Sequence, residues 1–334
     1  MNQAANSYLW HSPQWRQVID MVNQQRLPHA LLVGGVPGLG KLAFVRRLAA
    51  TLLCQQPIEG DACGQCKSCQ LMAAASHPDF TQLQPEEVGK AILVDSVRKL
   101  QTSLANTAQQ GGARVVIING ATDLNLNAAN ALLKQLEEPG ANCYFLLLHQ
   151  WPKAVLATVT SRCQKLDLAV PANAEAVSWL SQDMDAETAR QVLLLANGAP
   201  LHALDLFEQK AHAVRRQMLV QLTAILRGQQ TSLEVAQSWQ KLPLAQTFTW
   251  WIEWLNDLVK LKLTQDGSYI INTDLLELLQ AVAQRSDIAA IYQLLDAVTQ
   301  QLNYVHQRRN LNPQMVCEEL LNDWYLLVRS GAKQ

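Results

Sequence analysis

Apolar and polar positions follow two different periodicities in the first half of the chain. Continuous apolar runs at residues 30–33, 115–118 and 144–148 are typical of strands that are buried on both faces of a parallel sheet. Shorter runs at residues 79–83 and 165–168 predict two further strands. Between these runs, apolar residues recur every three or four positions, which indicates amphipathic helices at residues 42–53, 95–104 and 127–138. Strands that alternate with helices predict a wound α/β domain with a parallel sheet.

Polar residues mark where two of these helices are expected to begin. Asp95 precedes an apolar stripe and is expected to cap the helix that follows it. Asp123 stands before the helix at residues 127–138, and we expect it to cap that helix. Pro139 then ends the helix, since the residue before a proline is kept out of the helical region.

The second half of the chain shows only helical periodicity. Short helices are predicted at residues 174–181, 186–196 and 201–207, and longer ones at 214–226, 248–263, 275–283 and 289–304. We therefore expect three domains: an α/β domain at residues 1–168, a small helical domain at 169–208 and a larger helical domain at 209–334. Four tryptophans of the last domain lie among apolar residues at helical spacing, which favours a packed core or a subunit interface over base stacking: Trp239, Trp250, Trp251 and Trp254.

Composition and charge narrow the class of protein. The 334 residues are 49% hydrophobic, which is enough for full cores, and the net charge is -1. A dedicated nucleic-acid binder usually has a strong basic bias, and this chain has none. Residues 1–25 lack the apolar core of a signal peptide, and no uncharged apolar run reaches the roughly 18 residues that span a bilayer. We therefore expect a soluble, cytoplasmic protein.

A phosphate-binding loop is predicted between the first strand and its following helix. Gly35, Gly38, Gly40 and Lys41 fit the pattern G-x-x-x-x-G-K. Glycines let backbone N–H groups approach phosphate oxygens, and the following helix adds its positive end. The next residue is Leu42, however, where an active loop carries a Ser or Thr hydroxyl for magnesium.

A second part of a nucleotide-hydrolysing site is also missing. Active enzymes of this type carry an acidic residue at the end of a later strand, and here the strand at residues 115–118 leads into Asn119. With Leu42 and Asn119 together, the sequence predicts no hydrolysis by the chain itself. Whether the incomplete loop still binds nucleotide remains open.

Four cysteines predict a metal site. Cys54, Cys63, Cys66 and Cys69 form C-x8-C-x2-C-x2-C, and four thiolates close a tetrahedral shell around zinc with no open position. Such a site is structural. His77 is a spare ligand candidate, and three other cysteines without partners at metal spacing are expected to be buried thiols: Cys143, Cys163 and Cys317.

Arg162 has two possible roles. It precedes the predicted last strand, and its position alone favours an ordinary surface ion pair. The alternative is an arginine finger, which is supplied to a neighbouring subunit and stabilises the charge on a transferring phosphoryl group.

Several motifs together resemble the bacterial sliding-clamp-loader family of AAA+ proteins. They are Arg26-Leu-Pro-His-Ala30 before the loop, the four cysteines, the ten residues Asn-Ala-Leu-Leu-Lys-Gln-Leu-Glu-Glu-Pro at 130–139, and Ser161-Arg162-Cys163. The resemblance implies an AAA+ fold in two N-terminal domains, the second being a small helical lid. It also implies a helical collar that assembles a five-subunit ring.

The resemblance also implies specific roles and partners. Arg162 would be the finger that reaches ATP held by an adjacent gamma/tau subunit, and the cysteines would be the zinc module of the family. Further partners would be the delta subunit and, through the complex, the sliding clamp and primer–template DNA. The chain would belong to a DNA-directed DNA polymerase holoenzyme, a nucleotidyltransferase, without an ATPase activity of its own.

Two departures from active family members agree with that assignment. His149 stands where they have a polar threonine, and the segment from Gly198 to His202 lacks their second nucleotide-sensing arginine. Two alternatives remain: a stand-alone AAA+ ATPase that acts on DNA or protein, and a zinc-dependent DNA-binding adaptor.

Overall fold

The chain forms two compact units, Met1–Leu206 and Phe207–Gln334. The computed structural model describes residues 8–87, 90–104, 107–110, 112–150, 155–208, 211–307 and 309–329. None of the helices formed by these residues is both long and apolar enough to cross a membrane.

A parallel sheet forms the centre of the first unit. Its strands are β1 (Ala30–Gly34), β2 (Phe80–Leu83), β3 (Arg114–Asn119), β4 (Cys143–Leu148) and β5 (Gln164–Asp167). Their spatial order is β2-β3-β4-β1-β5, and every pair of neighbours is parallel. The predicted α/β fold with a parallel sheet is confirmed.

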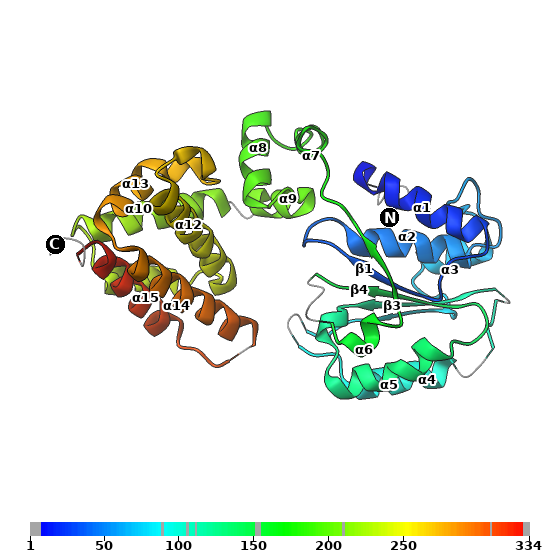
Figure 1. The fold of residues 1–334 in the computed structure, drawn as a ribbon. Helices are drawn as coiled ribbons and strands as arrows, with labels where there is room; N and C mark the ends of the chain where they lie inside the picture. Colours follow the sequence, from blue (N-terminus) through cyan, green and yellow to red (C-terminus); the bar gives the residue numbers. More distant parts are fainter. Residues whose placement is uncertain are drawn as a thin grey trace. The chain divides into compact units, whose positions relative to one another are not determined.

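Helices cover both faces of this sheet (Figure 1). On one face lie α1 (Ser12–Asn23) and α2 (Lys41–Leu53), and on the other lie α4 (Val94–Leu104), α5 (Leu126–Glu137) and the short α6 (Ala157–Thr160). Alternate residues of β1 enter different cores because successive side chains of a strand point to opposite faces. Leu31 packs with α1 and α2, whereas Leu32 packs with α4 and α5.

Short helices complete the first unit. They are η2 (Leu9–His11), α3 (Lys67–Ala73), η3 (Ala121–Asp123), α7 (Asn173–Leu180), α8 (Ala186–Leu195) and α9 (Pro200–Glu208). Asn197 and Gly198 end α8 with φ values of 52° and 79°, and Pro200 begins α9. Proline suits that first position because its missing N–H would have no partner there.

The predicted caps of two helices are wrong. Asp95 lies inside the first turn of α4, which begins at Val94. Asp123 belongs to η3, and Asn125 caps α5 by accepting a hydrogen bond of 2.8 Å from the N–H of Ala128. A cap needs an extended backbone just before the helix, and Asn125 has φ −68° and ψ 164°.

The second unit is helical, as predicted. Its elements are α10 (Ala211–Leu226), α11 (Ser232–Trp239), α12 (Leu244–Thr264), η5 (Gly267–Tyr269), η6 (Thr273–Leu275), α13 (Leu276–Arg285), α14 (Ile288–His306) and α15 (Pro313–Arg329). The four tryptophans are buried in its core. The rings of Trp239 and Trp251 meet edge to face at 5.2 Å, and Trp239 Nε1 donates to Gln221 Oε1 at 2.8 Å.

Candidate functional site

The predicted phosphate loop connects β1 with α2 and has the backbone of such a loop. Gly35, Gly38 and Gly40 have φ values of 141°, 80° and 81°, a region that L-amino acids rarely adopt. Lys41 is the first residue of α2, and its Nζ donates to the carbonyl oxygens of Gly35 and Val36, at 2.7 Å each. The loop therefore closes around its own lysine.

The lysine lies in a poorly hydrated environment. Burial lowers the pKa of Lys41 to about 8. His149, only 3% exposed, follows the end of β4 nearby, and burial and the positive charge of Lys41 lower its pKa while Asp167 opposes the shift. Burial and the charge of Lys41 therefore disfavour a second cation on His149 beside the lysine.

Side chains of the chain itself lie against the loop glycines. A Cβ atom at Gly40 would come within 2.5 Å of the Tyr8 ring, and one at Gly38 within 2.4 Å of His202 Cβ. The N–H of Leu201 also donates to the Gly38 carbonyl at 3.1 Å. The glycines that would approach a phosphate are thus in contact with the N-terminal segment and with α9.

Aromatic packing holds Tyr8 in that position. Its ring stacks on Trp10 with centroids 4.7 Å apart, and it meets Trp179 edge to face at 6.0 Å. Trp10 Nε1 donates to the Leu39 carbonyl at 3.0 Å, which ties the same segment to the loop.

The two residues that should supply the remaining chemistry have apolar or neutral side chains. Leu42 packs against the core formed by α1, α2 and the sheet. Asn119 is the last residue of β3, and Asp123, the next acidic residue, lies in η3. The loop is not followed by the hydroxyl, and β3 is not followed by the carboxylate, that would hold magnesium in an active enzyme.

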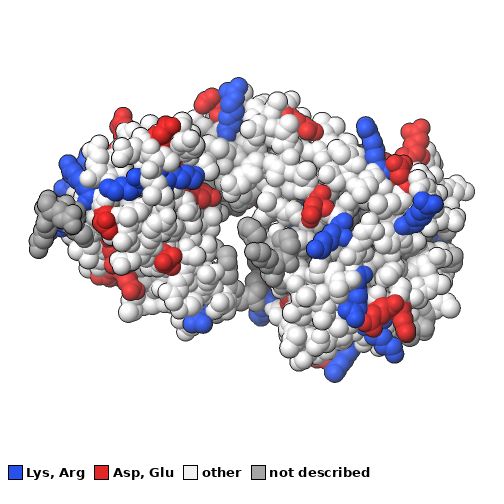
Figure 2. All heavy atoms as spheres, in the orientation of Figure 1, with Lys and Arg blue, Asp and Glu red and all other residues white. Residues whose placement is uncertain are grey.

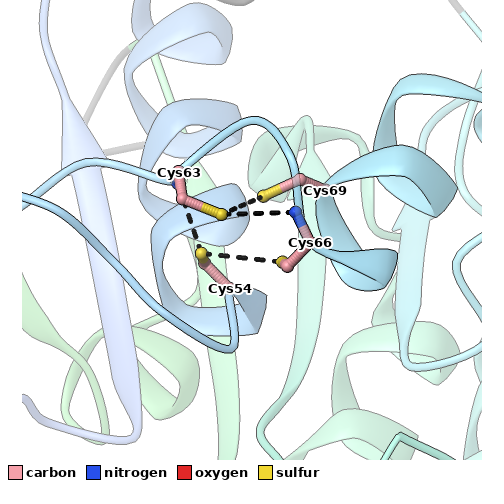
Figure 3. Close-up of side chains that lie close together, drawn as sticks. All are labelled: Cys54, Cys63, Cys66 and Cys69. Carbon is pink, nitrogen blue, oxygen red and sulfur yellow. Dashed lines mark hydrogen bonds between the residues drawn. The ribbon is translucent and has the colours of Figure 1, made fainter.

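The four predicted cysteines converge on one point (Figure 3). Their sulfur atoms all lie within 4.8 Å of one another, with Cys54 Sγ 3.8 Å from Cys66 Sγ and Cys63 Sγ 3.9 Å from Cys69 Sγ. With Zn–S bonds of about 2.3 Å, tetrahedral geometry places the sulfurs about 3.8 Å apart. The spacing of the thiols therefore fits one zinc ion.

Local backbone groups favour thiolates at two of these positions. N–H groups of Gln65 and Cys66 lower the pKa of Cys63. Burial opposes the shift at Cys66, but the N–H groups of Cys69 and Gln55 and the thiols of Cys69 and Cys63 lower its pKa to about 6. At the other two positions, Cys54 and Cys69, burial raises the pKa of the thiol. Thiolates are the form that binds a metal ion.

His77 does not join this group. It is buried, its Nε2 lies 3.2 Å from Ser68 Oγ, and its Nδ1 accepts from the N–H of Asp79 at 3.1 Å. Both ring nitrogens therefore have protein partners. The three remaining cysteines lie elsewhere: Cys143 and Cys317 are buried, as predicted, while Cys163 is only partly buried.

Arg162 and the phosphate loop lie at opposite ends of two neighbouring strands, β5 and β1. Arg162 precedes β5, whose first residue, Gln164, pairs with Leu31 near the beginning of β1, whereas the loop follows the end of β1. Four strand residues separate these levels by about 13 Å. Its Nε donates to Glu137 Oε1 at 2.6 Å, and its side chain is 32% exposed.

Several contact residues were not predicted from the sequence. Tyr8 belongs to no motif, and His202 lies in the segment from Gly198 that was noted only for its missing arginine, so neither contact with the loop was predicted. Glu137, by contrast, belongs to the family motif at residues 130–139. The motif indicated a functional segment, but it did not show that Glu137 contacts Arg162.

Known proteins resemble the chain over most of its length. The family described as "DNA polymerase III, delta subunit" matches residues 10–172, and the one described as "DNA polymerase III, delta subunit, C terminal" matches residues 209–325. The DNA polymerase III subunit delta' of Pseudomonas aeruginosa is 36% identical over 330 residues, which cover 98% of this chain and 100% of that protein. The chain belongs to the DNA polymerase III delta-prime family.

Other relatives carry the same name. The delta-prime subunit of Escherichia coli is 33% identical over 94% of each chain, and that of Haemophilus influenzae is 36% identical over 87% of this chain and 88% of its own. A solved gamma-subunit-related protein of Thermotoga maritima aligns over 95% of this chain with a TM-score of 0.45 and 16% identity. The resemblance to the clamp-loader family seen in the sequence is confirmed, and these relatives show that the chain belongs to its delta-prime branch.

Proposed function

We propose that the chain is a non-hydrolysing member of a bacterial clamp loader that supplies Arg162 to a neighbouring ATPase subunit. It joins gamma/tau and delta subunits in a five-membered ring, and the ring places the sliding clamp on primed DNA. Membership of the delta-prime family over nearly the full length supports this assembly.

The structure of the loop supports the proposed absence of ATP hydrolysis by the chain. Leu42 has no oxygen for magnesium and Asn119 has no carboxylate, and Tyr8 and His202 contact the glycines that would approach the phosphates. The loop then serves as a structural connection between β1 and α2.

The position of Arg162 carries the proposed role in trans. The arginine and the phosphate loop of its own chain lie at opposite ends of the parallel strands, so Arg162 is turned away from its own site. The guanidinium of Arg162 is partly exposed at its end of the strands, where it is available to a phosphate held by another subunit.

The cysteine centre is proposed as a structural zinc site. Four thiolates leave no open coordination position, so the ion would hold the loop between α2 and α3 and take no part in the reaction.

Contact with DNA is assigned to the assembled ring. On the face drawn in Figure 2, the Lys and Arg side chains of the described residues lie among Asp and Glu side chains. Such a mixed surface neutralises few phosphates in succession.

The test is the reconstituted complex with Arg162→Ala. We expect the five subunits to co-elute as in the wild type, while DNA-stimulated ATP turnover falls sharply, because a finger contributes about 10³-fold or more at its site. Arg98→Ala, which removes an exposed arginine paired with Asp95, is the matched control and should retain full turnover. Wild-type turnover in the Arg162→Ala complex would overturn the proposed role.

A further inference from the structure

Glu137 is the acidic partner of Arg162. It is the last residue of α5 and lies in the segment at residues 130–139, to which no role has yet been assigned. Its Oε1 accepts from Arg162 Nε at 2.6 Å and also contacts Nη2. The Glu137 carboxylate therefore binds one side of the guanidinium of Arg162, a residue 25 positions away in the sequence.

The other contacts of Arg162 fix the direction of the guanidinium group. Nη1 donates to the Thr158 carbonyl at 2.8 Å and, more weakly, to Ser161 Oγ at 3.3 Å. A guanidinium has five N–H groups in a rigid plane. Glu137 accepts from two of these N–H groups and Thr158 from one. One N–H on each Nη then remains at the outer end of the guanidinium for an incoming acceptor. The N–H on Nη1 becomes available when that acceptor displaces the long contact to Ser161.

This arrangement is the one that a pre-oriented finger requires. An arginine that is free to rotate must be ordered again at each reaction, whereas a donor held in place before the reaction costs no reorganisation. The pair is also partly exposed, with 32% of the arginine side chain and 48% of the glutamate side chain accessible. A phosphate can therefore reach the guanidinium without separating the pair.

We infer that Glu137 is a positioning residue: it holds Arg162 in the orientation in which its outer N–H groups meet the terminal phosphate of ATP on the neighbouring subunit. The inference rests on the proposed function of Arg162. Glu137 itself touches no substrate and acts through the arginine.

The experiment uses the reconstituted complex with the chain's gamma/tau and delta partners, primed DNA and the sliding clamp. The kcat and KM for ATP are measured with Glu137→Ala, Glu137→Gln, Arg162→Ala and the double variant Glu137→Ala/Arg162→Ala. Glu138→Gln is the matched control, because its carboxylate is adjacent in sequence and is not among the acceptors of Arg162 in the described residues.

We expect Glu137→Ala to lower kcat by about 10-fold with little change in KM, since misplacement of a group by about 1 Å can cost up to 10²-fold. Glu137→Gln keeps an acceptor oxygen at the same distance and should recover most of the rate. In the Arg162→Ala background, Glu137→Ala should cause no further loss, because there is no finger left to orient.

The outcomes separate this inference from the proposed function. If Arg162→Ala turns over ATP like the wild type, the finger itself is wrong. If Arg162→Ala is slow but Glu137→Ala matches the wild type or is faster, only the positioning role is wrong. An equal loss from Glu137→Ala with and without Arg162 would show a general structural effect and would also overturn it; melting temperatures and co-elution identify that case.

Discussion

Arg47 and Asp61 form a two-point ion pair that connects the cysteine centre with helices α1 and α2. Arg47 Nε donates to Asp61 Oδ1 and Nη2 to Oδ2, each at 2.6 Å. Asp61 lies in the loop between Cys54 and Cys63, whereas Arg47 belongs to α2. The guanidinium also lies 3.8 Å from the centroid of the Trp15 ring, on α1. One arginine thus fixes the metal-binding loop to two helices of the core.

We predict that Arg47→Met weakens zinc binding by about 10-fold, the lower end of the effect of substitutions behind metal ligands. The reason is that the loop loses its attachment while all four thiols remain. Competition with a chromophoric zinc chelator measures the affinity. Arg46→Met is the control, because Arg46 points to Gln82 and is exposed. Equal affinities in both variants would contradict a role for the ion pair.

Substitution of a ligand should have a larger effect. Cys66→Ser removes one of four converging thiols, so we expect less than half an equivalent of zinc after dialysis and a clear fall in the melting temperature, because metal binding and folding of such a loop are linked. Elemental analysis gives the zinc content. His77→Asn removes the spare ligand candidate and should keep one full equivalent, since both nitrogens of His77 have other partners; loss of zinc there would place His77 in the site.

The sequence was most informative where one local pattern determines the structure. The strands at the centre of the sheet are buried on both faces, so their runs of apolar residues are unambiguous. The cysteine spacing likewise requires the thiols to converge. The caps at Asp95 and Asp123 were wrong because a short polar residue favours a helix start without determining which of several such residues takes the extended backbone. No range was predicted for five α-helices of the described residues: α1, α3, α6, α11 and α15.

The contacts that define the candidate sites could not be predicted in this way. Arg162 and Glu137 are 25 residues apart in the sequence, and Arg47 and Asp61 are 14 apart. Tyr8 precedes β1 in the sequence, whereas Gly40, which it contacts, follows β1. These pairs depend on how helices pack on the sheet, which a single sequence does not specify. The segment at residues 130–139 indicated that a function was present, but only the fold showed Glu137 beside the arginine.

The lowered pKa of Lys41 predicts a pH-dependent stability. Its pKa is about 8 in the folded chain because of burial, against an ordinary value of 10.5. Between these two pKa values the unfolded chain binds more protons at Lys41 than the folded chain does. The free energy of unfolding therefore rises as the pH increases from 8 to 10.5. Below pH 8 the buried charge destabilises the folded chain in full. Lys41→Met lacks this dependence. We expect the melting temperature of Lys41→Met, relative to the wild type, to fall between pH 7.5 and pH 10; a constant difference would contradict the buried charge.

Restoring the missing hydroxyl should not restore an ATPase. Leu42→Ser completes the loop motif, but Asn119 still ends β3 without a carboxylate, and Tyr8 and His202 still contact Gly40 and Gly38. We therefore expect no phosphate release from ATP by isolated Leu42→Ser protein, together with a loss of about 2–3 kcal/mol of stability, because Leu42 packs against the core. A phosphate-release assay with and without magnesium measures the first effect and denaturant unfolding the second. Lys41→Ala in the same background is the control for a contaminating ATPase. The opposite result would be magnesium-dependent ATP turnover by Leu42→Ser that disappears when Lys41→Ala is added. It would show that the loop lacked only one hydroxyl, and that the contacts of Tyr8 and His202 leave it accessible to nucleotide.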